Sequence, residues 1–262
     1  MKRAISLLLT FAMLLSMFTV FFATSALAAT VITNTSPAIA VNVGTKITLS
    51  NYSVVFDGDS SATSGVTWKN GSTTITSFTP SAKGVTKLTA TSGSKSKSIY
   101  VVAKNASESE YVLYEANMAN YTTDKLTSDG WTLTSGASML EGDLIVNSTS
   151  VFLPSWLGEF GDYALSGDFR IKSATNSSRW FSLIIRADQL SNNPSYVQMC
   201  VRSDTTAASG VEFTEKYNNN GVGTWNVIKN ATGVHSQMGE KYRNVRIAAY
   251  GKTVSNELCG EQ

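Results

Sequence analysis

The sequence predicts an all-β fold. From Tyr163 to Ile171, apolar residues alternate with polar ones, which is typical of a strand with one buried and one exposed face. Clusters of Ser, Asn, Gly and Pro separate such runs at roughly eight- to twelve-residue spacing. Hydrophobic residues make up 42% of the chain and charged residues 15%, so a core can be buried. The 262 residues are enough for one large or two ordinary domains.

The first segment, residues 1–29, has the pattern of a signal peptide. Lys2 and Arg3 precede an apolar stretch from Ala4 to Phe22, and Ala26-Leu27-Ala28 matches a cleavage site. The pattern predicts secretion to the extracellular space or the cell surface. The apolar stretch also approaches the length of a membrane span, so an uncleaved anchor is the alternative.

Charge argues against two classes of partner. Without Lys2 and Arg3, the 21 basic residues fall to 19, which equals the number of acidic residues. A neutral mature chain has no field to attract nucleic acid or an anionic membrane. We expect no nucleic-acid partner, and no membrane association after cleavage.

Two cysteines are present, Cys200 and Cys259. Export permits a disulfide between them, but the pairing depends on geometry that the sequence does not give. We favour two free thiols.

Residues 30–104 predict a small β-sandwich with Trp68 in a central strand. The expected strands lie at 31–32, 38–44, 46–49, 65–68, 84–90 and 98–102. Asp57 and Asp59 are interpreted as carboxylates of a solvated turn, because the terminal Glu of a calcium loop is missing.

This segment resembles the bacterial immunoglobulin-like domains of secreted and surface proteins. The resemblance is carried by Val43-Gly44, Val66-Thr67-Trp68, Phe78-Thr79-Pro80, Leu88-Thr89-Ala90 and Ile99-Tyr100-Val101-Val102. It implies a spacer or adhesive module without chemistry, in which Trp68 belongs to the core.

Residues 105–110 are small and polar and predict a linker. Residues 111–262 then predict a larger β-sandwich without a convincing amphipathic helix. Runs at 163–171, 181–186 and 196–202 are separated by turn residues, and we expect them to be consecutive antiparallel strands of one sheet. A second sheet must cover the apolar face of this sheet.

The second segment resembles the concanavalin-A-like and laminin-G-like jelly-roll superfamily. The resemblance is carried by Trp131, Glu141-Gly142-Asp143-Leu144, the run 162–169, Ile184-Ile185-Arg186, Tyr196 and the run 242–247. Members mostly bind glycans or proteins, and some hydrolyse β-glucans.

The hydrolytic branch of that superfamily uses paired carboxylates on one strand. Glu141 and Asp143 come close to this pattern, but Ile145 or Val146 stands where the second glutamate belongs. Without it, no acid protonates the leaving sugar. We therefore predict no catalytic residues and interpret the step at Gly142 as a turn.

Metal and triad chemistry have little support. His235 is the only histidine, which disfavours a zinc site or a Ser/His triad. Glu159 and Asp162 are interpreted as turn carboxylates, with a structural calcium site as the alternative. No other cofactor is expected.

The remaining candidates are aromatic and polar residues that suit a glycan. Sugars present apolar faces and rims of hydroxyl groups, so a binding site combines an aromatic platform with polar side chains. Trp180 is the first candidate and shares a strand face with Arg186. The others are Tyr196, Arg202, Tyr217 and Trp225. Core packing is the alternative for each aromatic residue.

The last residues, 254–262, lack the alternation of a strand. Our hypothesis is that the second sandwich is C-terminally incomplete and that the chain is a truncated or frame-shifted part of a longer secreted protein.

Together these patterns favour a secreted, non-catalytic protein that binds a polysaccharide or cell-surface glycan. One alternative is a glycan-acting hydrolase, or the N-terminal targeting portion of one. Another is an adhesion protein with a protein ligand.

Overall fold

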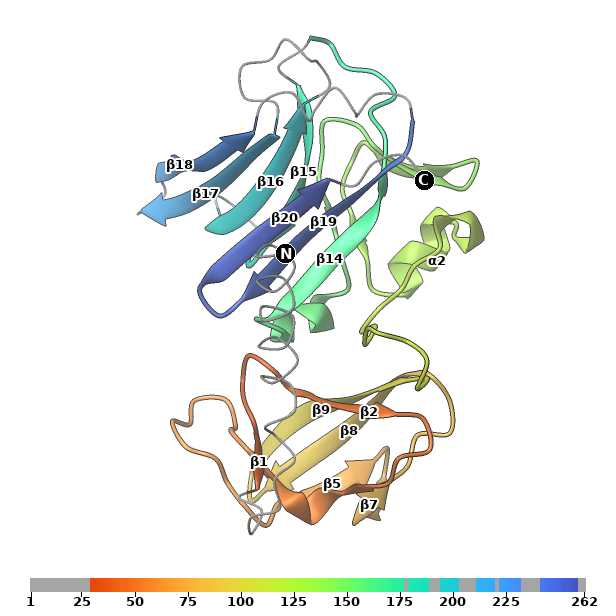
Figure 1. The fold of residues 1–262 in the computed structure, drawn as a ribbon, viewed down its shortest axis with the longest axis vertical. Coiled ribbons are helices and arrows are strands. Elements are labelled where there is room, and N and C mark those ends of the chain that lie inside the picture. Colours follow the sequence, from red (N-terminus) through yellow and green to blue (C-terminus); the bar gives the residue numbers. More distant parts are fainter. Residues whose placement is uncertain are drawn as a thin grey trace, which may run out of the picture. The chain divides into compact units, whose positions relative to one another are not determined.

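The computed structural model describes residues 29–176, 179–188, 194–202, 211–219, 222–231 and 241–258. These residues lie mainly in strands (Figure 1), so the prediction of an all-β chain is confirmed at this coarse level. Of the expected signal peptide, only Ala29 lies within the described residues. No helix in the described part of the chain has both the length and the apolar character needed to cross a bilayer.

The described residues divide into two compact units. The first comprises residues 29–33 and Ala38–Leu113, and the second comprises Asn34–Pro37 and the described residues from Tyr114 onward.

The first unit contains three sheets. Its strands are β1 (Thr30–Ile32), β2 (Ala38–Asn42), β3 (Ile47–Thr48), β4 (Tyr52–Val54), β5 (Thr67–Asn70), β6 (Thr73–Ile75), β7 (Ser77–Phe78), β8 (Gly84–Ser92) and β9 (Lys95–Lys104). The largest sheet has the order β2-β9-β8-β5-β6, while β1 pairs with β4 and β3 with β7. The pairs β1–β4 and β2–β9 are parallel.

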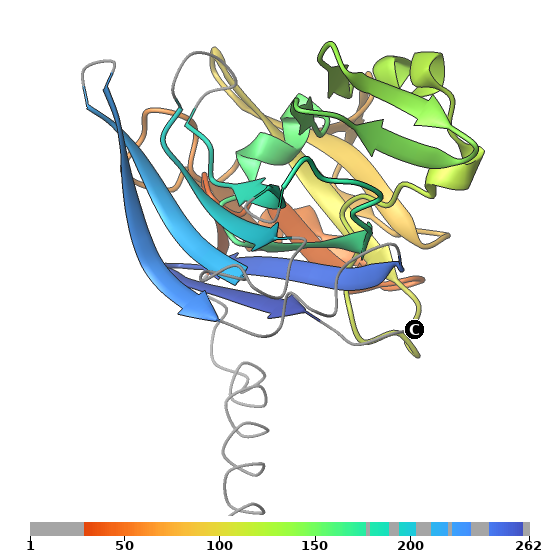
Figure 2. The ribbon, with the colours of Figure 1, turned by 90° about the horizontal axis from the view of Figure 1, so that it is seen from above.

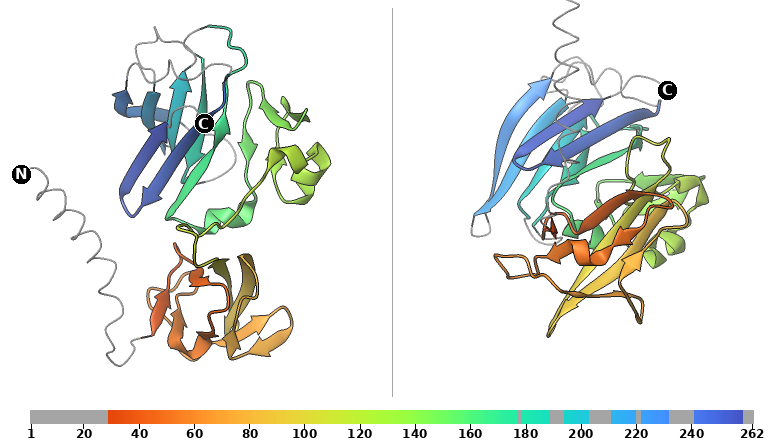
Figure 3. Two further views of the ribbon diagram at one scale, coloured as in Figure 1. Left: turned by 45° about the vertical axis from the view of Figure 1, so that its right-hand side comes forward. Right: turned by 60° about the horizontal axis from the view of Figure 1, so that its bottom comes forward.

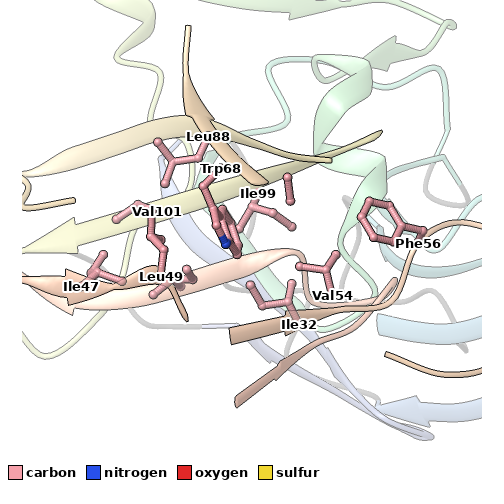
Figure 4. Packing of buried hydrophobic residues seen from close by; sticks show 11 residues of the cluster. Ile32, Ile47, Leu49, Val54, Phe56, Trp68, Leu88, Ile99 and Val101 are labelled. Atoms are coloured by element: carbon pink, nitrogen blue, oxygen red, sulfur yellow. The ribbon is translucent and has the colours of Figure 1, made fainter. Parts of the chain in front are cut away.

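Trp68 lies in the core of the first unit, as expected. It is 3% exposed and belongs to a cluster of apolar side chains from all three sheets. Figure 4 shows its indole among Leu49, Leu88 and Ile99. Along β8 the buried Leu88 and Ala90 alternate with partly exposed residues, whereas Ile99 to Ala103 of β9 are all buried.

The turn carboxylates Asp57 and Asp59 form ion pairs. Asp59 lies 2.6 Å from the Nζ atom of Lys95, and Asp57 lies 2.6 Å from that of Lys97. Lysine thus neutralises both carboxylates, which agrees with their interpretation as a solvated turn.

The expected linker begins with a turn attached to the first unit. The amide of Asn105 donates to Glu108 Oε2 at 2.8 Å, and the same carboxylate pairs with Lys83 at 2.6 Å. The chain between 105 and 108 is therefore held by side-chain contacts.

The second unit contains two larger sheets and two small hairpin-like pairs. Its strands are β10 (Thr132–Leu133), β11 (Ala137–Leu140), β12 (Asp143–Val146), β13 (Val151–Phe152), β14 (Tyr163–Phe169), β15 (Trp180–Ile185), β16 (Tyr196–Arg202), β17 (Val211–Asn219), β18 (Val222–Ala231), β19 (Arg243–Tyr250) and β20 (Thr253–Leu258). The larger sheets are antiparallel, with the orders β15-β16-β17-β18 and β14-β19-β20.

These two sheets share one core. Leu183 and Met199 of the four-stranded sheet belong to the same buried cluster as Val245 and Ile247 of the three-stranded sheet. Figure 2 shows the long blue strands β17 and β18 bending along their length. The bend agrees with a β-bulge in β18 opposite Phe213 and Thr214, because bulges increase local twist.

The expectation that the runs at 163–171, 181–186 and 196–202 share one sheet is wrong. β15 pairs with β16, but β14 pairs with β19 in the facing sheet. The segment after β14 carries the chain from one sheet to the other. The alternation along β14 is nevertheless as predicted, because Tyr163, Leu165 and Phe169 pack against the core.

A short helix also differs from expectation. α2 (Thr123–Ser128) begins after Thr122, whose hydroxyl accepts a hydrogen bond from the Lys125 amide at 3.2 Å. It buries Leu126, and Figure 3 shows it beside the β11–β12 hairpin. Six residues are too few to show a helical period, so the sequence pattern misses this helix.

Another correction concerns residues after Tyr250. Gly251, at φ 54°, and Lys252 form a two-residue turn, and β20 then pairs with β19 from Thr253 to Leu258. The main-chain hydrogen bonds of this hairpin hold a strand that has no apolar alternation.

Candidate functional site

The four-stranded sheet has a second face, directed away from the shared core. Leu183 of β15, Met199 of β16 and Phe213 of β17 point into the core. In each strand, the residues that alternate with these core residues therefore lie on the opposite face of the sheet, which we call the outer face. Figure 1 shows its strands, β15 to β18, side by side. Across the sheet, the outer face carries the rows Trp180–Arg202, Ser182–Cys200–Glu212, Ile184–Gln198–Thr214–Val227 and Tyr196–Lys216–Trp225.

One end of the outer face is an aromatic ring with a cation against it. The guanidinium of Arg202 lies 5.4 Å from the ring centroid of Trp180, whose residue surface is 48% exposed. Arg202 Nη2 also donates to Glu212 Oε2 at 2.7 Å, and both side chains are 14% exposed. The sheltered ion pair holds the guanidinium in place beside an accessible indole.

The diagonally opposite end has the same combination. Tyr196 and Trp225 meet edge to face, with ring centroids 5.8 Å apart and an interplanar angle of 79°. The Nζ atom of Lys216 lies 5.5 Å from the first ring centroid and 5.6 Å from the second. Gly223 makes room for this lysine, because an added Cβ there would lie 2.7 Å from Lys216 Cε.

The centre of the outer face is polar and buried. Gln198 and Thr214 are each 3% exposed, and Cys200 is 2% exposed. Among the described residues, Arg202 Nη1 is buried without a hydrogen-bond partner, whereas the Thr214 side chain forms a hydrogen bond with the Cys200 thiol. Unused hydrogen-bonding capacity of this kind is rare in folded proteins.

Cys200 does not act as a nucleophile here. Burial, reinforced by the negative charge of Glu212, raises the pKa of its thiol to about 12. The reactive thiolate form is therefore negligible at neutral pH. Cys200 is a free cysteine, and Cys259 lies outside the described residues.

Four of the six predicted site residues lie on the outer face: Trp180, Tyr196, Arg202 and Trp225. They form two separate groups. Three rows along the strands and three strand spacings across them place the two tryptophans ~25 Å apart diagonally.

Arg186 does not share the strand face of Trp180, contrary to the expectation from alternation. Its backbone has φ 52°, which ends the alternation of β15 and turns the side chain away from Trp180. Its guanidinium donates to the carbonyl of Gly161 at 3.0 and 3.1 Å and to Asp162 at 3.1 Å. Arg186 therefore links the end of β15 to the start of β14.

Tyr217 does not lie on the outer face with the other candidates. Along β17 it alternates with Lys216, so it lies on the core-side face of the sheet. It remains 49% exposed there, near the end of the strand, and a hydrogen bond with Glu215 raises the pKa of its phenol. It cannot join the same surface as Trp225.

Several outer-face residues were not predicted as site residues: Gln198, Glu212, Thr214 and Lys216. The sequence could have indicated the last three. If the apolar alternation of Val211 and Phe213 is continued along the strand to Tyr217, then Glu212, Thr214 and Lys216 fall on the opposite face.

The carboxylates considered for catalysis serve local structure. Glu141 and Gly142, at φ 52° and 85°, form the two-residue turn between β11 and β12, which agrees with the predicted turn. Asp143 pairs with Arg170 at 2.6 Å and accepts a hydrogen bond from the Tyr242 hydroxyl at 2.5 Å. These contacts hold the pKa of Asp143 below its usual value, with the tyrosine hydrogen bond as the larger cause. An open hollow of about 370 Å³ lies beside the turn, and the residues that line it include two acids, Asp124 and Glu141.

The alternative of a calcium site at Asp162 gains no support. Asp162 Oδ1 accepts hydrogen bonds from Arg186 and from the amide of Gly251 at 2.9 Å. Within the described residues, no group of three or more His, Cys, Asp or Glu side chains is arranged to hold a metal ion. His235 lies outside the residues that the structure describes.

Comparison with known proteins adds no relative: no protein family, curated protein or solved structure matches this chain. The outer face must therefore be interpreted from its own chemistry.

Proposed function

We propose that this chain is a secreted, non-catalytic protein of two β modules that binds a polysaccharide through the outer face of β15–β18. In this proposal the first module is immunoglobulin-like and serves as a spacer, and the second is a concanavalin-A-like jelly roll. The leader pattern ending at Ala26-Leu27-Ala28 supports export.

One observation carries the proposal: two half-exposed tryptophans flank a polar centre on a single sheet face. Trp180 is 48% exposed and Trp225 is 51% exposed, although tryptophan is usually well buried. Each ring can stack against the apolar face of a sugar. Gln198 and Thr214, between them, are each 3% exposed, so the proposal assigns the sugar contacts to the two exposed rings and to the polar side chains beside them.

The arrangement of acids supports binding rather than hydrolysis. Glu212 is the single carboxylate of the outer face among the described residues, and its partner is Arg202. Glycoside hydrolysis by paired carboxylates needs two acids flanking the bond.

Affinity electrophoresis in gels that contain soluble polysaccharides tests the proposal. Trp180→Ala and Trp225→Ala should each abolish the retardation of the protein, because each removes one platform. Tyr217→Ala is the matched control: this residue is 49% exposed on the other face of the same sheet, and its loss should leave retardation unchanged. Equal retardation of all three variants and the wild-type chain would overturn the proposal, as would release of reducing sugar by the wild-type chain.

A further inference from the structure

The two aromatic groups of the outer face have one feature that a neutral sugar does not require. A cation lies against the ring at each end: Arg202 against Trp180, and Lys216 against both Tyr196 and Trp225. A sugar stacked on either tryptophan would have its substituents next to a positive charge.

The cation at the first end has unused hydrogen-bonding capacity. Glu212 occupies Nη2 of Arg202, while Nη1 is buried without a partner among the described residues. A guanidinium presents its donors as a rigid fork that matches a carboxylate or sulfate group. Because Nη1 is buried, a ligand anion would have to displace the side chains that cover it in order to satisfy it, and the gain would be relief of a costly unpaired donor.

The cation at the second end is positioned by packing. Lys216 lies between two rings and over Gly223, where a larger residue would meet its Cε. Its Nζ lies beside both rings.

From this geometry we infer that the glycan recognised by the outer face is an acidic polysaccharide, whose anionic groups contact Arg202 and Lys216 while its sugar rings stack on Trp180 and Trp225. This inference rests on the proposed function. A chain with repeated acidic groups suits the site because the two ring–cation groups are ~25 Å apart, farther than one sugar unit reaches.

The test compares acidic with neutral polysaccharides on the full chain. Affinity gels are cast with polygalacturonate for carboxylates, dextran sulfate for sulfates, and unmodified dextran or hydroxyethyl cellulose as neutral chains. We expect an acidic polysaccharide to retard the protein, and we expect this retardation to weaken as salt is raised. Comparing the polygalacturonate gel with the dextran sulfate gel distinguishes carboxylate from sulfate recognition. Retardation by neutral chains alone would overturn the inference and leave the proposed function standing. No retardation in any gel would overturn both.

Variants separate a specific contact from general attraction of polyanions. Lys216→Met should weaken binding of the acidic polysaccharide about tenfold or more, as expected for loss of a charge-assisted hydrogen bond, and Lys216→Arg should restore most of it. Lys252→Met removes the same charge from the exposed turn before β20 and is the matched control. An equal loss for Lys216→Met and Lys252→Met would overturn the inference. Because Lys216 is partly exposed, these variants should fold, and a thermal melt checks this.

Discussion

At the scale of single residues, burial decides which side chains can do chemistry. Cys200 shows this most clearly, because it lies on the outer face beside the proposed ligand contacts yet is 2% exposed. Gln198 and Arg202, which are two residues before and after Cys200 in β16, share that face. Proximity to a site therefore does not make the thiol reactive.

Alkylation should test the state of Cys200. With the thiol pKa raised to about 12, iodoacetamide at pH 8 should leave Cys200 unmodified in the folded chain and modify it in urea. Mass spectrometry of the Cys200 peptide measures both states, and the urea sample controls for reagent activity. Modification of the folded protein at the rate seen in urea would contradict the burial of this residue.

The same raised pKa makes stability depend on pH in the alkaline range. The folded state keeps the thiol proton up to about pH 12, whereas the unfolded thiol releases it above its ordinary pKa of 9.0. The unfolding free energy should therefore fall above pH 9, by up to ~1.4 kcal/mol per pH unit. The difference between the wild-type chain and Cys200→Ala in denaturant titrations isolates this contribution.

At the scale of elements, the β11–β12 hairpin depends on backbone geometry that few residues adopt. Both turn residues have positive φ, 52° at Glu141 and 85° at Gly142, as a two-residue type I′ turn requires. Asp143 then connects the hairpin to Arg170 and Tyr242. The hairpin is thus connected to the three-stranded sheet, because Arg170 follows β14 and Tyr242 precedes β19.

Substitutions in this turn should have opposite effects. Gly142→Ala should destabilise the chain by ~1–2 kcal/mol, because alanine disfavours positive φ and its Cβ would lie 3.3 Å from Ala119 Cα. Glu141→Asn should stabilise it by a few tenths of a kcal/mol, because Asn-Gly suits this turn. Urea denaturation measures both changes. Gly158→Ala is the control, because an added Cβ there would meet no atom within 4 Å and the residue does not have a positive φ. If both glycine substitutions changed the unfolding free energy equally, this account of the turn would be wrong.

Strands with a long alternating pattern were predictable from the sequence, and so was the antiparallel pairing of β15 with β16, but the partner of β14 was not. The period-two pattern gave β14, β15 and β16 with the correct buried faces. Pairing is a non-local property, so nothing in the pattern of β14 indicated that it belongs beside β19 rather than β15. β20 escaped prediction because pairing with β19 holds it without an apolar stripe.

The same distinction applies to the candidate site. Residues within long runs, such as Trp180 and Arg202, could be assigned to one face from the sequence. Arg186 follows the end of β15, where its positive φ breaks the alternation, so its face could not be predicted. Tyr217 lies beyond the short predicted run at Val211 and Phe213, so its face was not assigned from the sequence. The contacts with Lys216 join β16, β17 and β18, so they required the register of three strands.

At the scale of the whole molecule, the first unit has its own core. Trp68, Leu88 and Ile99 belong to a buried cluster whose members all come from the first unit. Hydrophobic burial of this kind is sufficient to stabilise many domains of similar size. The segment from residue 29 to Leu113 should therefore fold when expressed alone.

Fluorescence can test this expectation, because Trp68 is the single tryptophan between residues 29 and 113. The isolated segment should show the blue-shifted emission of a buried indole and a cooperative red shift in urea, with β-type circular dichroism lost over the same range. Trp68→Phe is the spectroscopic control, since it removes the emission while largely keeping the apolar ring. Leu88→Ala should lower the urea midpoint through a cavity cost of ~2–5 kcal/mol. Red-shifted emission without denaturant would mean that this core cannot form by itself, and the boundary near Leu113 would then not mark an independently folding module.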